Sequence, residues 1–235
     1  DIQTELVKIY FKQNESDRAF ENFSKMLGKD SLGFMEKVQV GELYYNLISQ
    51  DESAKDIARN IFLKLNSDYP REWVPYYYLG ILDILDKDVN GYRENFRRSI
   101  EYADTSSDAY VNVGLALFQQ NDTEDALKTL DEGLIKFQDD FRLLYVKGLT
   151  LQRMDKVPEA ITYFEKAIEI NPNDVSMLST LALAYDGQGK FMESAEIYEK
   201  ALKIDPQNAL VLNNYAYNLS ERGVDLNKAL EMSKI

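Results

Sequence analysis

The sequence predicts an all-α protein, built as an α-solenoid of repeated helix pairs. Three features favour this fold: a period of 34 residues, apolar residues at helical spacing, and turn residues between the helices. The period is visible in "EKAIEINPND" (165–174) and "EKALKIDPQN" (199–208), which begin 34 residues apart and share five of ten residues. Self-similarity at a fixed period is typical of repeat architectures.

Two columns of residues recur at this period. One contains only small residues, namely Gly80, Gly114, Gly148, Ala182 and Ala216. The other contains large apolar residues, namely Phe62, Phe96, Leu130, Phe164 and Tyr198. We expect the small residues where two helix backbones approach closely, because side-chain size sets the distance between packed helices.

One period, residues 175–208, illustrates the expected helix pair. Its first apolar stripe has the spacing i, i+3, i+4, i+7 and consists of Leu178, Leu181, Ala182 and Tyr185. A second stripe consists of Ser194, Ile197, Tyr198, Ala201 and Leu202. Between them, Gly187 and Gly189 supply turn conformations. Pro206 ends the second helix because it lacks a backbone donor, so each unit is predicted to be two antiparallel amphipathic helices.

These residues resemble the tetratricopeptide repeat, whose pattern is W-x2-L-G-x2-Y, then A-x3-F, then Pro. The first part is matched by Tyr76-x2-Leu79-Gly80, Tyr110-x2-Val113-Gly114 and Leu178-x2-Leu181-Ala182-x2-Tyr185. The second part is matched by Ala58-x3-Phe62, Ala126-x3-Leu130, Ala160-x3-Phe164 and Ser194-x3-Tyr198, and the last by Pro70, Pro172 and Pro206. The resemblance covers essentially the whole chain and implies a right-handed superhelix of about six to seven helix-pair units. Turns such as "NPND" and the stretch 212–223 resemble bacterial members of the family.

We expect a single solenoid domain over residues 1–235. Its units are expected at approximately 1–33, 39–72, 73–106, 107–140, 141–174, 175–208 and, truncated, 209–235. About five extra residues are placed in "LGKDSLGF" (27–34). Because a solenoid needs a polar cap on its last helix and the last unit stops partway, the chain is predicted to be a fragment of a longer protein.

Some positions depart from the repeat pattern. Lys147 stands in a column that otherwise contains Leu79, Val113 and Leu181. Asp83 stands in a column with Leu117, Leu151 and Tyr185. Asp104 and Gln138 replace the terminal proline.

Composition excludes several classes of function. The net charge is −13, with 27 Lys and Arg against 40 Asp and Glu, which argues against nucleic acid as a partner. The charge suits either attraction to a basic partner or solubility. The chain has no Cys and no His, so thiol or imidazole nucleophiles and the usual zinc ligands are excluded. No run approaches the roughly 18 to 20 apolar residues of a membrane span. A chain without cysteine suits the cytosol and a bacterial envelope equally.

One segment imitates a metal site. In "DKDVNGYRENFR" (86–97), Asp86, Asp88, Asn90 and Gly91 match the first half of a calcium loop, but the glutamate due at the twelfth position is Arg97. The segment also coincides with a turn between helices, where Asp, Asn and Gly are common. Phosphate-binding and nucleophile-elbow motifs are absent from the sequence. The chain is therefore predicted to be no enzyme and to need no cofactor or metal.

The resemblance implies that the first helix of each unit lines a concave surface that receives a peptide or helix. Applying the spacing i, i+3, i+7, i+10 selects Val74, Tyr77, Ile81, Val111, Leu115, Arg142, Tyr145, Leu149, Leu183, Asn213 and Tyr217 as candidate binding residues. The alternative is that some of them pack between units. Only Asn112 and Arg142 match the carboxylate clamp with which some members hold acidic chaperone termini, so that variant is not expected.

The predicted function is a scaffold or adaptor that binds a protein or peptide in this groove. Two alternatives stay open. The chain could be the repeat region of a larger enzyme or envelope-assembly protein, or it could form homodimers through its last, uncapped helix.

Overall fold

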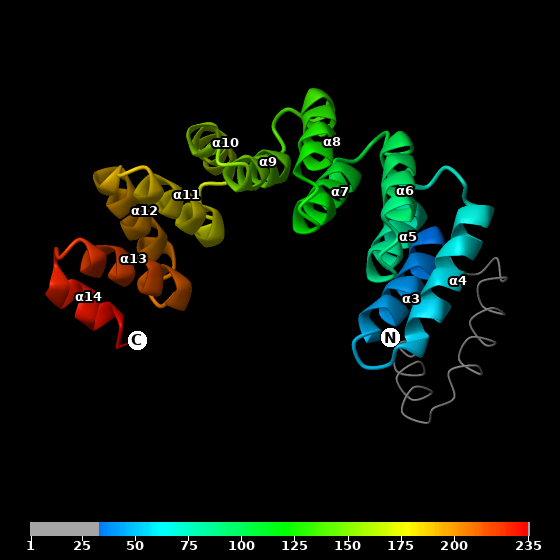
Figure 1. The fold of residues 1–235 in the computed structure, drawn as a ribbon, viewed down its shortest axis with the longest axis horizontal. Helices are drawn as coiled ribbons and strands as arrows, with labels where there is room; N and C mark the ends of the chain where they lie inside the picture. The colour runs from blue at the N-terminus through cyan, green and yellow to red at the C-terminus, as the bar shows by residue number, and fades with distance from the viewer. Residues whose placement is uncertain (1–32, 235) are drawn as a thin grey trace. The chain divides into compact units, whose positions relative to one another are not determined.

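The computed structural model describes residues 33–234 (Figure 1). Every regular element in that range is an α-helix. The helices are α3 (Phe34–Leu47), α4 (Ser53–Asp68), α5 (Trp73–Leu85), α6 (Val89–Glu101), α7 (Asp108–Gln119), α8 (Thr123–Lys136), α9 (Phe141–Arg153), α10 (Val157–Ile170), α11 (Val175–Gly187), α12 (Phe191–Ile204), α13 (Ala209–Glu221) and α14 (Leu226–Met232). The unit expected at 1–33 lies outside the described residues, except for Gly33.

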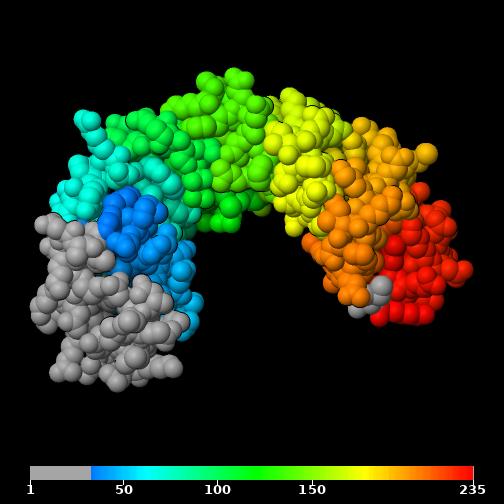
Figure 2. Space-filling model, turned by 180° about the vertical axis from the view of Figure 1, so that it is seen from behind, coloured from blue at the N-terminus to red at the C-terminus, as the bar shows by residue number. Residues whose placement is uncertain are grey.

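The chain divides into two compact units, with the boundary between Ala109 and Tyr110. In the first unit α3 packs on α4, α4 on α5, and α5 on α6. In the second unit α9 packs on both α8 and α10, α11 on α10 and α12, and α13 on α11, α12 and α14. Figure 2 shows the same order for the second unit, where successive segments lie against one another from green to red. Contacts within a helix pair and between successive pairs are typical of a solenoid, and the all-α solenoid is confirmed.

The two repeating columns meet inside each helix pair. The large residues Phe62, Phe96, Leu130, Phe164 and Tyr198 are almost completely buried. A Cβ atom added to Gly80 would lie 2.5 Å from Cε1 of Phe96, and one added to Gly114 would lie 2.7 Å from Cδ2 of Leu130. The small residue on the first helix thus makes room for the large residue on the second.

The turn inside a pair also repeats at the 34-residue period. One residue in each of five turns has a positive φ, between 59° and 70°, and these residues are Lys87, Asn121, Asp155, Gly189 and Gly223. The amide that follows each of them donates to the carbonyl five residues earlier, at 2.9–3.0 Å. This is the 6→1 hydrogen bond of a Schellman motif. Gly189, Gly223 and Asn121 are residue types that this motif favours, whereas Lys87 and Asp155 give no comparable sequence signal.

The segment that partly matches a calcium loop contributes ion pairs and a helix cap to the fold. Asp86 forms ion pairs with Lys55 at 2.7 Å and Arg59 at 2.8 Å. Asp88 is the N-cap of α6 and accepts a hydrogen bond from the amide of Gly91 at 2.9 Å. These two carboxylates therefore tie a turn to its neighbouring helices.

Helix α3 begins at Phe34, five residues ahead of the start that the sequence pattern placed at residue 39. The amide of Gly33 donates to Oε2 of Glu36 at 2.6 Å, which caps the first turn. The ring of Phe34 packs against that of Tyr69, with centroids 5.0 Å apart. Local capping and packing extend the helix beyond the repeated pattern.

Candidate protein-binding surface

In the first unit, the predicted binding residues lie on α5 and contribute mainly to packing. Val74 is buried in the hydrophobic core of this unit, and Ile81 is half-buried. The ring of Tyr77 stacks on Phe96 with centroids 6.1 Å apart. Burial raises the pKa of Tyr77 to about 12. Tyr77 therefore offers only part of its ring to a ligand.

In the second unit, the predicted residues become more exposed toward the C-terminus. Half-buried positions are Val111 and Leu115 on α7 and Arg142, Tyr145 and Leu149 on α9. Exposed positions are Leu183 on α11 and Asn213 and Tyr217 on α13. Tyr217 leaves 66% of its surface exposed. An exposed tyrosine and leucine on neighbouring first helices form an accessible apolar surface.

Arg142 and Tyr145 also line a cavity of about 220 Å³ between α9 and α11. The other side of this cavity is formed by residues at the N-terminal end of α11, namely Asp174, Ser176 and Met177. Tyr145 shares a hydrogen bond with Thr180, Oη to Oγ1, at 2.9 Å, and burial raises the pKa of its phenol. The Tyr145 ring is thus fixed in place at the mouth of a cavity.

The guanidinium of Arg142 is oriented by the cap of its own helix. Asp140 accepts hydrogen bonds from the Arg142 amide at 2.8 Å and from Nη2 at 2.7 Å. A carboxylate at a helix N-terminus is favourable for the helix dipole. Arg142 therefore faces the cavity as half of an ion pair.

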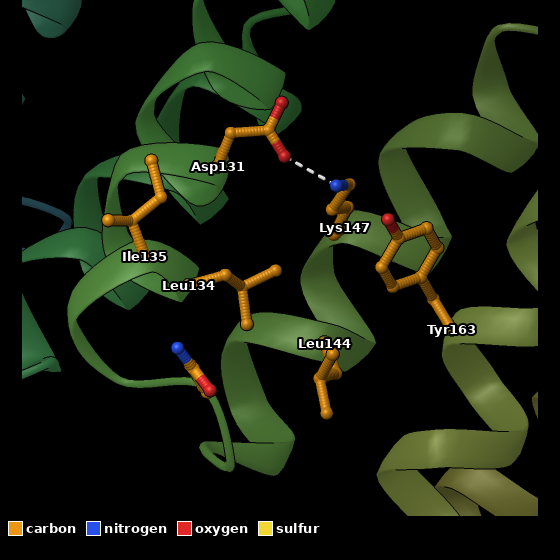
Figure 3. A pocket seen from close by; sticks show the side chains of 7 residues that line it. Asp131, Leu134, Ile135, Leu144, Lys147 and Tyr163 are labelled. Carbon is orange, nitrogen blue, oxygen red and sulfur yellow. Dashed lines mark hydrogen bonds and ion pairs between the residues drawn. The ribbon is translucent and has the colours of Figure 1, made fainter.

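A second cavity, of about 470 Å³, lies between α8 and α10 beside α9 (Figure 3). Its lining consists of Asp131, Leu134, Ile135, Gln138, Leu144, Lys147 and Tyr163. The ammonium of Lys147 forms an ion pair with Asp131 and lies 4.3 Å from the Tyr163 ring centroid. Burial lowers the pKa of Lys147, but Asp131 and Tyr163 outweigh this effect and the pKa is raised. In the sequence, Lys147 and Gln138 are recognisable only as departures from the repeat. These departures occur in adjoining units, and that is the signal that could have located the cavity.

Comparisons with known proteins agree with the helix-pair architecture. A family model described as the N-terminal tetratricopeptide-repeat region of psidin matches residues 116–219. Residues 116–219 therefore match a tetratricopeptide-repeat family. No curated protein matches its sequence.

Three solved structures with distinct names are similar to this chain. MamA is 24% identical, with 68% of this chain and 94% of MamA covered and a TM-score of 0.56. PilF of Pseudomonas aeruginosa is 19% identical, with 86% and 90% covered and a TM-score of 0.65. YrrB, a TPR protein described as having an unusual peptide-binding site, is 18% identical, with 83% and 97% covered and a TM-score of 0.55. At these identities the likeness shows a shared fold.

None of the helices among residues 33–234 combines the length and apolar character that crossing a bilayer requires.

Asp186, on α11 three residues after Leu183, is a half-buried carboxylate. Tyr198 donates to its Oδ2 at 3.3 Å, while Oδ1 is buried with no hydrogen-bond partner among the described residues. Burial raises the pKa of Asp186 above its usual range. The folded protein thus binds this proton more tightly than the unfolded chain, so its stability falls as the pH rises from the ordinary value toward the raised one.

We expect Asp186→Asn to raise the melting temperature at pH 7, because the amide removes the cost of burying a charge. Below the ordinary aspartate pKa of about 4, the advantage over the wild type should disappear, because the carboxyl is then protonated in both the folded and the unfolded chain. Melting curves by circular dichroism at pH 7 and at about pH 3.5, just below that value, would measure it. Glu196→Gln, at an exposed site on α12, is the control, and a lower melting temperature of Asp186→Asn at pH 7 would contradict the assignment.

Proposed function

We propose that this chain is a non-enzymatic tetratricopeptide-repeat scaffold or adaptor whose first-helix surface in the second unit binds a peptide or protein segment. This surface comprises Arg142, Tyr145, Leu149, Leu183, Asn213 and Tyr217. The observation that carries the proposal is the exposure of Leu183 and Tyr217 on the neighbouring helices α11 and α13. Solenoids typically bind partners through extended surfaces of this kind, and tyrosine is enriched among binding hot spots.

The polarity of the surface favours a protein segment over nucleic acid. Its polar members are mostly neutral, and the chain carries a net charge of −13. Neutral hydrogen-bonding groups between apolar side chains suit a peptide backbone with alternating side chains. The peptide-binding site described for YrrB supports the same class of ligand.

The test is affinity capture from native lysate with quantitative mass spectrometry. The variant Leu183→Glu/Tyr217→Glu places two charges on exposed positions, so helicity should be unchanged while captured partners fall at least tenfold. Leu63→Glu, on the exposed side of α4 in the first unit, is the matched control. If the double variant captures the same proteins at the same level as the wild type, the first-helix surface is not the binding surface.

Self-association is a second candidate, favoured by the exposed side chains of Leu226 and Leu230 on α14. Appending a polar capping helix should then abolish concentration-dependent dimers in sedimentation velocity. Leucines on the last helix that are exposed in the monomer would be covered in the dimer.

A further inference from the structure

An aromatic row spans α3 and α5, the first helices of two successive pairs in the first unit (Figure 1). It consists of Tyr45 on α3 and of Trp73, Tyr77 and Tyr78 on α5. The centroids of neighbouring rings along the row lie 5.2 to 6.3 Å apart. All four side chains are half-buried, so each of them leaves part of its surface accessible to a ligand.

The repeat itself does not require aromatic residues at these positions. The copy 34 residues later carries Ser107 where this copy carries Trp73, and Val111 where it carries Tyr77. That copy still forms its helix pair, α7 and α8, so the pairing of helices does not explain the rings. Aromatic side chains are enriched at protein interfaces relative to the rest of the surface, and the aromatic row has this composition.

The aromatic row also carries hydrogen-bond donors that the fold leaves unused. The Tyr45 and Tyr77 hydroxyls and the Trp73 indole N–H form no hydrogen bond with any described residue. These three atoms are not among the buried polar atoms that lack a partner in residues 33–234, so they are open to solvent. The hydroxyl of Tyr78, in contrast, donates to Oε1 of Glu42 at 2.8 Å.

Rings and free donors together match the chemistry of a proline-rich segment. Such a segment adopts the extended polyproline II helix, whose backbone carbonyls are free to accept, and its prolines have no N–H to donate. The segment therefore offers apolar rings and acceptors, while the aromatic row offers rings and donors. Aromatic-lined grooves bind proline-rich segments in this way, because the polyproline II helix is already formed before binding and loses little entropy.

We propose that the aromatic row is a second binding surface of this chain, and that it binds a proline-rich segment of a partner protein. The proline rings pack on the accessible ring faces, and the carbonyls accept from the Trp73 indole and from the Tyr45 and Tyr77 hydroxyls. The row has no charged member, and the carboxylate beside it, Glu42, is engaged by Tyr78, which favours a neutral segment over a charged one. The row belongs to the first unit, whereas the proposed function rests on residues of the second.

The test uses Trp73 itself, because it is the single tryptophan of the chain and its fluorescence reports on the aromatic row. The full chain is titrated with a ten-residue polyproline peptide and, in parallel, with a Gly-Ser peptide of the same length. We expect a saturable change in Trp73 emission with polyproline, and binding of the Gly-Ser peptide at least tenfold weaker. About 0.5 M salt should leave the polyproline titration unchanged, because screening weakens only interactions between charges.

Two variants of Tyr77 examine its ring and its hydroxyl separately. Tyr77→Val introduces the residue type of Val111, so it should keep its helicity by circular dichroism and yet bind polyproline at least tenfold more weakly. Tyr77→Phe keeps the ring and removes the donor, so it should weaken binding severalfold.

Tyr217→Val on α13 is the matched control. It alters the surface of the proposed function and should leave the polyproline titration unchanged, which separates the two proposals. The inference about the aromatic row is overturned if polyproline and the Gly-Ser peptide give the same titration, or if Tyr77→Val binds polyproline as tightly as the wild type.

Discussion

Replacing Phe164 with alanine is expected to destabilise the second unit by about 3 to 5 kcal/mol, the usual cost of truncating a buried phenylalanine. Phe164 is completely buried. Its ring contacts Tyr145, with centroids 5.7 Å apart, and faces the backbone of Gly148. The cavity left by the ring cannot close easily, because α9 and α10 are fixed by their other contacts. Urea denaturation followed by far-ultraviolet circular dichroism would measure the loss.

The partner of this change is Gly148→Ala, which should also destabilise, by about 1 to 3 kcal/mol, because its Cβ would overlap the Phe164 ring. In the Phe164→Ala background the same Cβ enters empty space. The double variant should therefore lose clearly less than the sum of the single losses. Additive losses would show that the small and large columns do not act as a pair.

Replacing Arg59 with leucine is expected to destabilise the first unit by about 2 to 3 kcal/mol, because it leaves a buried carboxylate without its cation. Nη1 of Arg59 lies 2.7 Å from Oδ1 of Asp83, and Nδ2 of Asn95 donates to Oδ2 at 2.7 Å. The Asp83 side chain is 9% exposed and that of Arg59 26%. The partial exposure of Arg59 keeps the expected loss below the cost of breaking a fully buried pair.

The reverse change, Asp83→Leu, should cost less than about 1 kcal/mol. It introduces the residue type found at Leu117 and Leu151, and Arg59 keeps its ion pair with Asp86 at 2.8 Å. Thermal unfolding of both variants measures this asymmetry. Equal losses for the two variants, or a larger loss for Asp83→Leu, would contradict the assignment.

Much of the fold can be predicted from the sequence because each unit repeats the same contact between its two helices. The column of Gly80, Gly114 and Gly148 and the column of Phe96, Leu130 and Phe164 are two halves of one contact, so their periodicity reveals helix pairs. Positions without such a partner are harder to predict. The start of α3 at Phe34 depends on a local cap and on contact with Tyr69, and neither repeats.

The candidate sites could be predicted only in part. Helical spacing selects Tyr145 and Tyr217 equally, but the structure leaves Tyr217 largely exposed and ties Tyr145 to Thr180 and Phe164. The same spacing selects Val74, which the structure buries. Exposure depends on what the next helix pair places over a residue, and a single-helix pattern contains no such information.

The sequence by itself determined the all-α repeat, the helix pairs and the residues that fill them, because these follow from local spacing and side-chain size. Only the tertiary structure decided what the departures from the pattern do. Asp83 forms an ion pair with Arg59 and a hydrogen bond with Asn95, which lie on two other helices. Lys147 forms an ion pair with Asp131 and lies over the ring of Tyr163. A buried charge is tolerated only where such partners converge, and that convergence depends on how neighbouring helices pack.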